Sequence, residues 1–176
     1  MRDVIRAHLK ARTAGDAGQT WSEVTALAEQ ELNSNVPGSY RDDGNAVEIF
    51  GLTEPLTPAA VLVALIERSA GMTVLLTRRT ESLSSHGGQI SFPGGSMEAQ
   101  DSGPQDAALR EAHEEIDLHP RHVEVLGELP EYPTVTGFVI SPFVGWVDPV
   151  ARVFPDDSEV ARLIEVPLAH IMCLDN

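Results

Sequence analysis

Residues 92–118, FPGGSMEAQDSGPQDAALREAHEEIDL, constrain the chain more than any other stretch. They close on REAHEEIDL, which places Glu111, Glu114 and Glu115 within five positions. Residues three and four apart share one face of a helix, so Glu111 aligns with both of the others. Gathered carboxylates repel one another unless a cation lies among them, and oxygen ligands suit Mg²⁺ or Mn²⁺ better than Zn²⁺. The cluster indicates a metal site or a solvated acidic face, and the preceding glycine turn and Arg110 favour the metal site.

Length and composition favour one domain without a membrane span. The chain has 176 residues with 42% apolar content, which is enough for a sizeable core. No apolar run approaches the ~18 residues that a membrane span needs. The basic N-terminus lacks the apolar centre of a secretory signal, and Asp3 and Asp16 disfavour the alternative of an organelle-targeting peptide. The single Cys173 excludes an internal disulfide and favours a cytoplasmic location.

The formal net charge of −15 limits the partners. A surface this acidic repels phosphate backbones, so no nucleic-acid partner is expected. A small anionic substrate stays compatible with this charge if metal ions neutralise it locally. That condition agrees with the glutamate cluster.

The first third of the chain predicts helices followed by a connector. Residues 4–12 and 21–32 have helical spacing, and Thr20 or Ser22 is available to cap the second helix. Residues 34–57 are rich in Pro, Gly, Asn and Asp, which is typical of irregular structure. Residues 1–57 are therefore expected to form an N-terminal helical extension and connector, and residues 58–176 the main domain.

The remaining pattern predicts a sheet-rich α+β domain. Apolar runs at 59–67 and 72–77 flank Ser-Ala-Gly and predict a hairpin, followed by a loop at 78–88. The acidic helix is expected to start near Pro104 or Gln105, with Ser102 or Asp101 available as its cap, and to end by Asp117 or Leu118. Pro142 predicts an edge strand or a bulge at 138–147, because proline lacks an N–H. Further strands are expected at 89–92, 122–129 and 160–166, with a last helix from Pro167.

Residues 95–118 resemble the signature of the Nudix hydrolases, G-x-x-x-x-x-E…REUXEEXGU. The matching positions are Arg110, Glu111, Ala112, Glu114, Glu115 and Leu118. There are two departures: the acidic residue ahead of the helix is offset, so Asp101 or Glu98 takes its place, and Asp117 replaces the usual glycine. The resemblance implies an α/β/α sandwich around a mixed β-sheet, with a catalytic loop–helix motif.

Residues 75–95, LLTRRTESLSSHGGQISFPGG, are similar to the upstream pattern of the coenzyme A pyrophosphatases, LLTxR[SA]xxxRxxxGxxxFPGG. A motif loop one residue longer than usual also resembles this subgroup. Thr80 replaces the usual Ser or Ala, and Ser84 replaces an arginine that is a candidate phosphate contact. The implied reaction is metal-dependent hydrolysis of coenzyme A or acyl-CoA to 3′,5′-ADP and (acyl-)4′-phosphopantetheine.

The resemblance also implies roles for the motif residues. Glu111 and Glu115 become the main ligands of Mg²⁺ or Mn²⁺, together with the carbonyl of Gly95. Glu114 completes the metal shell or orients a water. Arg110 pairs with Glu98, Asp101 or a helix glutamate to hold the loop against the helix. The general base is Glu111 or Glu159, although Glu159 also fits a solvated loop acid.

Substrate contacts are expected from residues outside the helix. Arg79 is favoured over Arg78 as a phosphate ligand because it matches the subgroup pattern. His86 and Gln89 flank two glycines and are further candidates, with a structural role as the alternative for the histidine. Tyr132 and Phe138 bracket a loop on which an adenine stacks, with simple packing as the alternative.

Other functions stay open. The substrate can be a different nucleoside diphosphate derivative, such as ADP-ribose or a dinucleotide. A Nudix-fold module that binds a nucleotide without cleaving it is a second alternative, which the intact glutamate set disfavours. The sequence stops at Asn176, so a short or truncated last helix is expected, and an inactive remnant is a third alternative. A homodimer is left open.

Overall fold

The structure is a computed structural model that describes residues 1–13, 56–81, 87–134 and 136–172. Cys173, the expected helix at 21–32 with its caps Thr20 and Ser22, and the connector up to residue 55 lie outside the described residues. The described helices are α1 (Arg2–Thr13), α4 (Pro104–Ile116), α5 (Leu168–Ile171) and the 3₁₀ turn η1 (Pro120–His122). The described strands are β1 (Thr57–Arg68), β2 (Gly71–Arg79), β3 (Ile90–Ser91), β4 (Gly94–Ser96), β5 (Val123–Glu128), β6 (Tyr132–Pro133), β7 (Phe138–Val147) and β8 (Val160–Pro167).

These strands form one mixed sheet whose main path runs β3-β2-β1-β7-β5. Strands β1 and β7 are parallel, whereas β2 is antiparallel to β1 and to β8, and β5 is antiparallel to β7. The predicted hairpin of residues 59–67 and 72–77 is confirmed: it closes with Arg68 opposite Gly71. A φ of 127° at Gly71 suits this turn, because only glycine adopts that conformation without strain.

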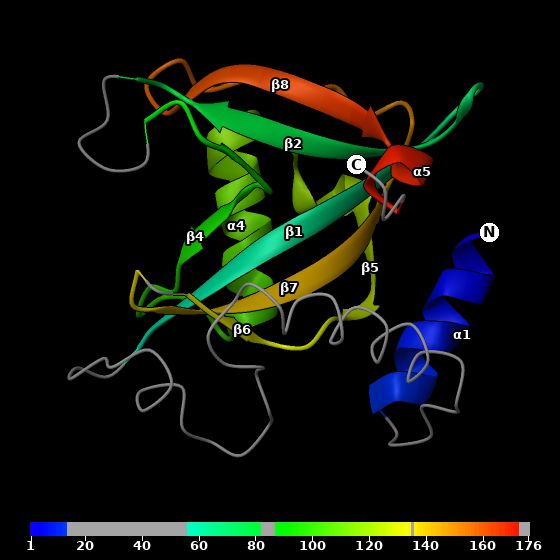
Figure 1. The fold of residues 1–176 in the computed structure, drawn as a ribbon, viewed down its shortest axis with the longest axis horizontal. Coiled ribbons are helices and arrows are strands. Elements are labelled where there is room, and N and C mark those ends of the chain that lie inside the picture. Colours follow the sequence, from blue (N-terminus) through cyan, green and yellow to red (C-terminus); the bar gives the residue numbers. More distant parts are fainter. Residues whose placement is uncertain (14–55, 82–86, 135, 173–176) are drawn as a thin grey trace, which may run out of the picture.

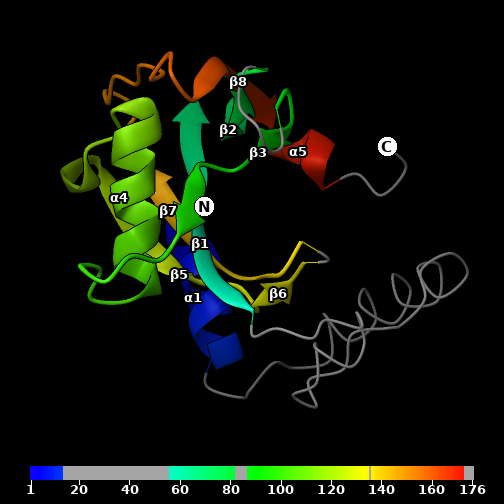
Figure 2. The same cartoon turned by 90° about the vertical axis from the view of Figure 1, so that its left-hand side faces the viewer.

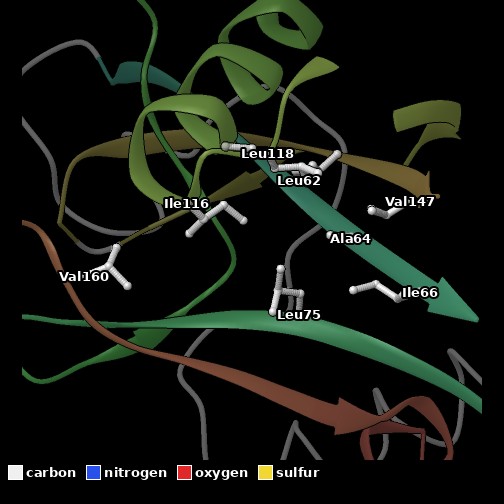
Figure 3. Close-up of a cluster of buried hydrophobic side chains, with 9 residues drawn as sticks. Leu62, Ala64, Ile66, Leu75, Ile116, Leu118, Val147 and Val160 are labelled. Atoms are coloured by element: carbon white, nitrogen blue, oxygen red, sulfur yellow. The ribbon is translucent and has the colours of Figure 1, made fainter. Parts of the chain in front are cut away.

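Helices cover both faces of the sheet (Figure 2), which confirms the predicted α/β/α sandwich. Alternate residues of β1 explain the layering, since successive side chains of a strand point to opposite faces. Leu62 packs with Ile116 and Leu118 at the end of α4, as Figure 3 shows. Leu65 faces the other way and lies in a cluster with Leu9 of α1, against which Leu168 of α5 also packs. Each fully buried leucine or isoleucine contributes about 1.5–3 kcal/mol.

Helix α1 is fitted closely against β5. A side chain at Gly127 would place its Cβ only 2.8 Å from Cβ of Leu9, so the glycine lets the helix approach the sheet. Arg2 and Arg6 both form ion pairs with Glu124 on β5. Helix α1 therefore contributes to the core beside β5. No helix in the described ranges is long and apolar enough to span a membrane.

The prediction that Pro142 marks an edge or a bulge is wrong. Strand β7 lies between β1 and β5, and the bulge falls in β5, between Val125 and Gly127. Pro142 accepts a hydrogen bond from the amide of Leu129 at 2.8 Å, on the side where pairing passes from β5 to β6. Because the nitrogen and the carbonyl of one strand residue face the same side, the missing N–H breaks no bond to β1.

The predicted bounds of the acidic helix are confirmed, but its predicted cap is wrong. Helix α4 begins at Pro104, and its N-cap Gly103 makes no side-chain capping bond. Ser102 instead donates to the Asp106 carboxylate from both its amide and its hydroxyl, each at 3.1 Å. The Asp101 carboxylate instead accepts hydrogen bonds from Arg110 and from the amide of Glu98.

Asp117 ends α4 in a left-handed conformation, with φ 52° and ψ 26°. It is the only non-glycine with positive φ among the described residues, at the position where the family signature has glycine. Asp117→Gly is expected to raise the free energy of unfolding by about 0.5–1 kcal/mol, because glycine adopts this conformation without strain. Thermal melts measure this as a midpoint about 1–4 °C higher. Asp157→Gly, without such a φ, is the control, and a lower midpoint for Asp117→Gly would contradict the explanation.

Candidate active site

Strands β1 and β2 diverge toward one end of the sheet (Figure 1), and a cleft lies beside the diverging part. Strand β1 pairs with β2 only from Ala64 onward, and along residues 59–61 it pairs with the short strand β4 instead. The resulting cleft has a volume of about 540 Å³, which lies within the range of small-molecule sites. Its lining residues are Ala59, Val61, Arg79, Gln89, Ser91, Phe92, Gly94, Gly95, Ser96, Glu98, Arg110, Glu111, Glu114, Glu115, Thr136, Phe138, Ile140 and Glu159.

The two glycines of the motif belong to β4, where the sequence predicted a turn. At Gly94 a Cβ would lie 2.3 Å from the carbonyl oxygen of Ala60, and φ is 154°, so the residue must be glycine for β4 to pair with β1. At Gly95 a Cβ would lie 2.6 Å from Oε1 of Glu111. The absent side chains therefore let the backbone approach both β1 and the first glutamate of the motif.

Glu115 is the buried carboxylate of the site, with a side chain only 4% exposed. Its Oε2 accepts a hydrogen bond from the amide of Gly94 at 3.2 Å, and its Oε1 lies 3.4 Å from Nη1 of Arg79. Burial raises the pKa of Glu115 to about 7, and the charge of nearby Glu111 adds to this rise. The amide of Gly94 and the guanidinium of Arg79 therefore stabilise the ionised form of Glu115 only in part.

Arg110 connects the motif loop to the helix. It donates to both oxygens of Asp101, at 2.9 and 3.1 Å, and to the carbonyl of Ser96 at 3.1 Å. Its Nη1 also bonds Glu111 at 3.0 Å and Glu114 at 2.8 Å. The hydrogen bonds from Arg110 hold the pKa of Asp101 below its usual range, whereas burial raises the pKa of Glu111.

Asp101, and not Glu98, is the acidic residue that precedes the helix and accepts hydrogen bonds from Arg110. Its carboxylate is 2% exposed and bonds Arg110 at both oxygens, while Glu98 lies 3.9 Å from the same guanidinium. The sequence named both acids as partners of Arg110 but expected the acidic residue of the signature to be offset. That offset is wrong, because five residues separate Gly95 from Asp101, as in the signature G-x-x-x-x-x-E.

Glu159 reaches the cleft from the turn before β8. The backbone of Arg79–Thr80 holds this turn: the amide of Thr80 donates to the carbonyl of Glu159 at 2.9 Å. The Glu159 carboxylate lies 3.7 Å from Nη2 of Arg79, whereas Glu115 contacts Nη1 of the same guanidinium. Pairing between β2 and β8 thus brings a residue far along the chain to the glutamates of α4.

The predicted substrate contacts divide into those inside and outside the cleft. Arg79 and Gln89 line it, whereas Arg78 turns to Glu81 at 3.0 Å. Tyr132 is 60% exposed and is not among the lining residues, although Phe138 is. His86 lies outside the described residues.

The residues present fit a hard divalent cation. The cleft carries five glutamates against two arginines, so its donors are oxygens and its charge is negative. Within the described residues, no three acidic, histidine or cysteine side chains are already gathered as a bound metal requires. Glu111 and Glu114 face Arg110, and Glu115 faces Arg79. Burial raises the pKa of Glu111 and of Glu115, and a bound cation would stabilise the ionised form of both carboxylates.

A family model for the NUDIX domain matches residues 56–168, so the chain belongs to the Nudix family. A curated relative from Pectobacterium atrosepticum, named uncharacterized Nudix hydrolase NudL, is 44% identical over 116 residues, covering 66% of this chain and 60% of the relative. A relative of the same name from Citrobacter koseri is 40% identical over 127 residues, covering 72% of this chain and 66% of the relative. The chain thus spans less than two thirds of the length of these relatives. The predicted membership of the Nudix family is confirmed.

Solved structures agree on the fold. RenU, a Nudix hydrolase from M. smegmatis, superposes with a TM-score of 0.56 at 23% identity, covering 68% of this chain and 75% of that one. The NUDIX domain of Shewanella oneidensis NrtR, complexed with ADP ribose, has a TM-score of 0.52 at 18% identity, covering 82% and 86%. At these identities the likeness shows the fold alone. Nudix hydrolases generally use divalent metal ions.

Glu115 is expected to make the stability of the metal-free protein depend on pH. The folded state keeps a proton that the unfolded chain loses, because the pKa of Glu115 is about 7 when folded and 4.5 otherwise. The free energy of unfolding should therefore fall as pH rises from about 4.5 to about 7, by up to ~3 kcal/mol, with no further loss above that window. Urea unfolding in EDTA at about pH 5 and about pH 7.5 measures this difference. An equally steep fall in Glu115→Gln would contradict the assignment.

Proposed function

We propose that the chain hydrolyses the pyrophosphate bond of coenzyme A or acyl-CoA with Mg²⁺ or Mn²⁺, giving 3′,5′-ADP and (acyl-)4′-phosphopantetheine. The observation that carries this proposal is the lining of one cleft by Glu111, Glu114 and Glu115 together with Arg79 and Arg110. A cleft with more acidic than basic groups accepts a pyrophosphate only when divalent cations accompany it. The family membership supports the reaction class, and the LLTRRT…FPGG resemblance supports coenzyme A.

Glu111, Glu114, Glu115 and the carbonyl of Gly95 are the groups that would hold the metal. When bound, the metal neutralises phosphate oxygens and acidifies a water. Arg110, fixed by Asp101, keeps the glutamates and the β4 loop in a constant arrangement, which is the positioning that phosphoryl transfer requires.

Glu159 is the favoured general base, with Glu111 as the alternative. The Glu159 side chain is half-exposed and faces the cleft, so it can accept a proton from an attacking water and pass it to solvent. Glu111 is more buried and bonds Arg110 at 3.0 Å, which suits a ligand better than a proton acceptor.

The side of the cleft formed by β1 and β7 favours a substrate with a bulky organic group beside its pyrophosphate. Val61, Phe138 and Ile140 supply apolar surface there, on which an adenine or a pantetheine arm can pack. Gln89 adds a polar side chain to the lining of the cleft. Phe138 replaces Tyr132 as the stacking residue in this proposal, because Tyr132 does not line the cleft.

The test compares substrates that differ in one group. Purified protein is incubated with Mg²⁺ or Mn²⁺ and coenzyme A, dephospho-coenzyme A, ADP-ribose or a diadenosine compound, and the products are identified. Coenzyme A is expected to give the highest kcat/KM, by about tenfold or more over ADP-ribose, because recognition of its 3′-phosphate adds a charged contact. Equal rates on coenzyme A and ADP-ribose would remove the coenzyme A assignment.

The same substrate panel also tests two alternative functions. NrtR, whose structure contains ADP ribose, motivates ADP-ribose as the competing substrate class. Binding of any panel compound without cleavage would instead favour a nucleotide-binding module. A cytoplasmic location and a homodimer stay predictions.

A further inference from the structure

The two arginines of the cleft are held very differently. Arg110 uses all its nitrogens in bonds of 2.8–3.1 Å to Asp101, Glu111, Glu114 and the carbonyl of Ser96. The nearest carboxylate oxygens to Arg79 belong to Glu115, at 3.4 Å, and Glu159, at 3.7 Å. Both distances exceed the 2.7–3.2 Å range of normal hydrogen bonds. Arg110 is therefore a fixed structural cation, whereas the guanidinium of Arg79 is held by one long hydrogen bond to Glu115 and by a longer ion pair with Glu159.

The backbone of Arg79 is firm although its side chain is loosely held. Its amide donates to Gln89 at 2.9 Å, and its carbonyl accepts from Gly88 at 3.2 Å. Within the described structure its Nε is buried and has no hydrogen-bond partner. The guanidinium of Arg79 thus extends from a well-held backbone and lies near the carboxylates of Glu115 and Glu159. Its buried Nε–H has no acceptor within the described structure, which costs free energy unless a ligand supplies one.

We propose that Arg79 is a movable counter-ion that couples metal binding to substrate binding. Without metal it lies between Glu115 and Glu159 and partly neutralises both. When Glu111, Glu114 and Glu115 hold a divalent cation, the guanidinium of Arg79 would be displaced from Glu115, and its donors would then face the anionic part of the substrate. This inference rests on the proposed function, because it requires a metal-dependent site that accepts a phosphate ester or anhydride.

Such a counter-ion has opposite effects on the two binding steps. It competes with the metal for carboxylates, so its removal strengthens metal binding. It supplies a charged donor to the substrate, so its removal weakens anion binding. A merely structural arginine would weaken both steps together or change neither.

The test measures Mn²⁺ binding without turnover. Free Mn²⁺ is titrated by electron paramagnetic resonance at about pH 8.5, where Glu115 is ionised. Arg79→Gln and Arg79→Met are expected to bind Mn²⁺ about fivefold or more tightly than wild type, and Arg79→Lys, which keeps the charge, close to wild type. Arg78→Gln is the matched control, since Arg78 turns to Glu81 outside the cleft and its loss should leave Mn²⁺ affinity unchanged.

The second arm measures anion binding in saturating Mn²⁺. Calorimetric titration with α,β-methylene-ADP, which is not hydrolysed, is expected to show affinity about fivefold or more lower for Arg79→Gln than for wild type or Arg78→Gln. Unchanged or weaker Mn²⁺ binding by both neutral variants, with wild-type melting curves, would overturn the inference. Wild-type protein that binds Mn²⁺ with the expected Arg79 effects but cleaves no coenzyme A would overturn the proposed substrate alone.

Discussion

Glu115→Gln is expected to lower metal-dependent turnover about a thousandfold or more, the largest effect of any single change in the chain. The buried carboxylate faces the amide of Gly94 and the guanidinium of Arg79, both of which are donors. A glutamine has the same size but carries one oxygen, so its amide nitrogen must face one of these donors. It also loses the charge that would hold a divalent cation. Steady-state kcat in saturating Mn²⁺ measures the loss.

The matched control for this variant is Glu67→Gln. Glu67 is an exposed residue of β1 beside the hairpin turn and does not line the cleft, so activity should stay within about twofold of wild type. Glu115→Gln should still fold, because burying a neutral amide costs less than burying a charge. Turnover within about tenfold of wild type for Glu115→Gln would contradict a role for this residue in holding the metal.

Gly95→Ala is expected to lower kcat about a hundredfold, although it adds a single methyl group. The new Cβ would lie 2.6 Å from Oε1 and 2.7 Å from Cδ of Glu111, so the glutamate has to move. Displacing a catalytic group by about 1 Å is enough for a loss of this size. Melting curves and kcat together separate this effect from unfolding.

Gly103→Ala is the control for the glycine prediction. It lies in the same loop, immediately before α4, and a Cβ there would meet no atom within 4 Å. Its φ of 167° is extended backbone that alanine also adopts. Gly103→Ala should therefore keep nearly full activity. A Gly95→Ala variant as active as Gly103→Ala would mean that close approach to Glu111 is not needed.

The sequence was sufficient where a pattern is local. The β1–β2 hairpin followed from two apolar runs on either side of Ser-Ala-Gly, and α4 followed from its proline start and charged face. The convergence of Glu111, Glu114 and Glu115 followed from helical spacing alone. These features depend on neighbours within a few residues, which the sequence displays directly.

Features that depend on distant neighbours were missed or misjudged. Strand β4 contains two glycines, which have low strand propensity, and it pairs with β1 only because β2 diverges there. Pro142 is tolerated between two neighbouring strands because it falls where pairing passes from β5 to β6. The choice of Asp101 over Glu98 depends on how the loop folds back onto Arg110.

The position of Arg79 in the cleft also depends on residues that are distant in the sequence. The sequence favoured Arg79 over Arg78 by resemblance, and strand alternation places these neighbours on opposite faces, one toward the cleft and one toward Glu81. The position of Arg79 between Glu115 and Glu159 requires the pairing of β2 with β8, which no local pattern displays.

Product analysis with coenzyme A tests the central proposal most directly. Protein is incubated with coenzyme A in Mn²⁺ and in EDTA, and the products are identified by mass spectrometry. The expected result is 3′,5′-ADP and 4′-phosphopantetheine in equal amounts with Mn²⁺, and intact coenzyme A with EDTA or with Glu115→Gln. Intact coenzyme A in Mn²⁺, or equal cleavage in EDTA, would contradict a metal-dependent pyrophosphatase acting on coenzyme A.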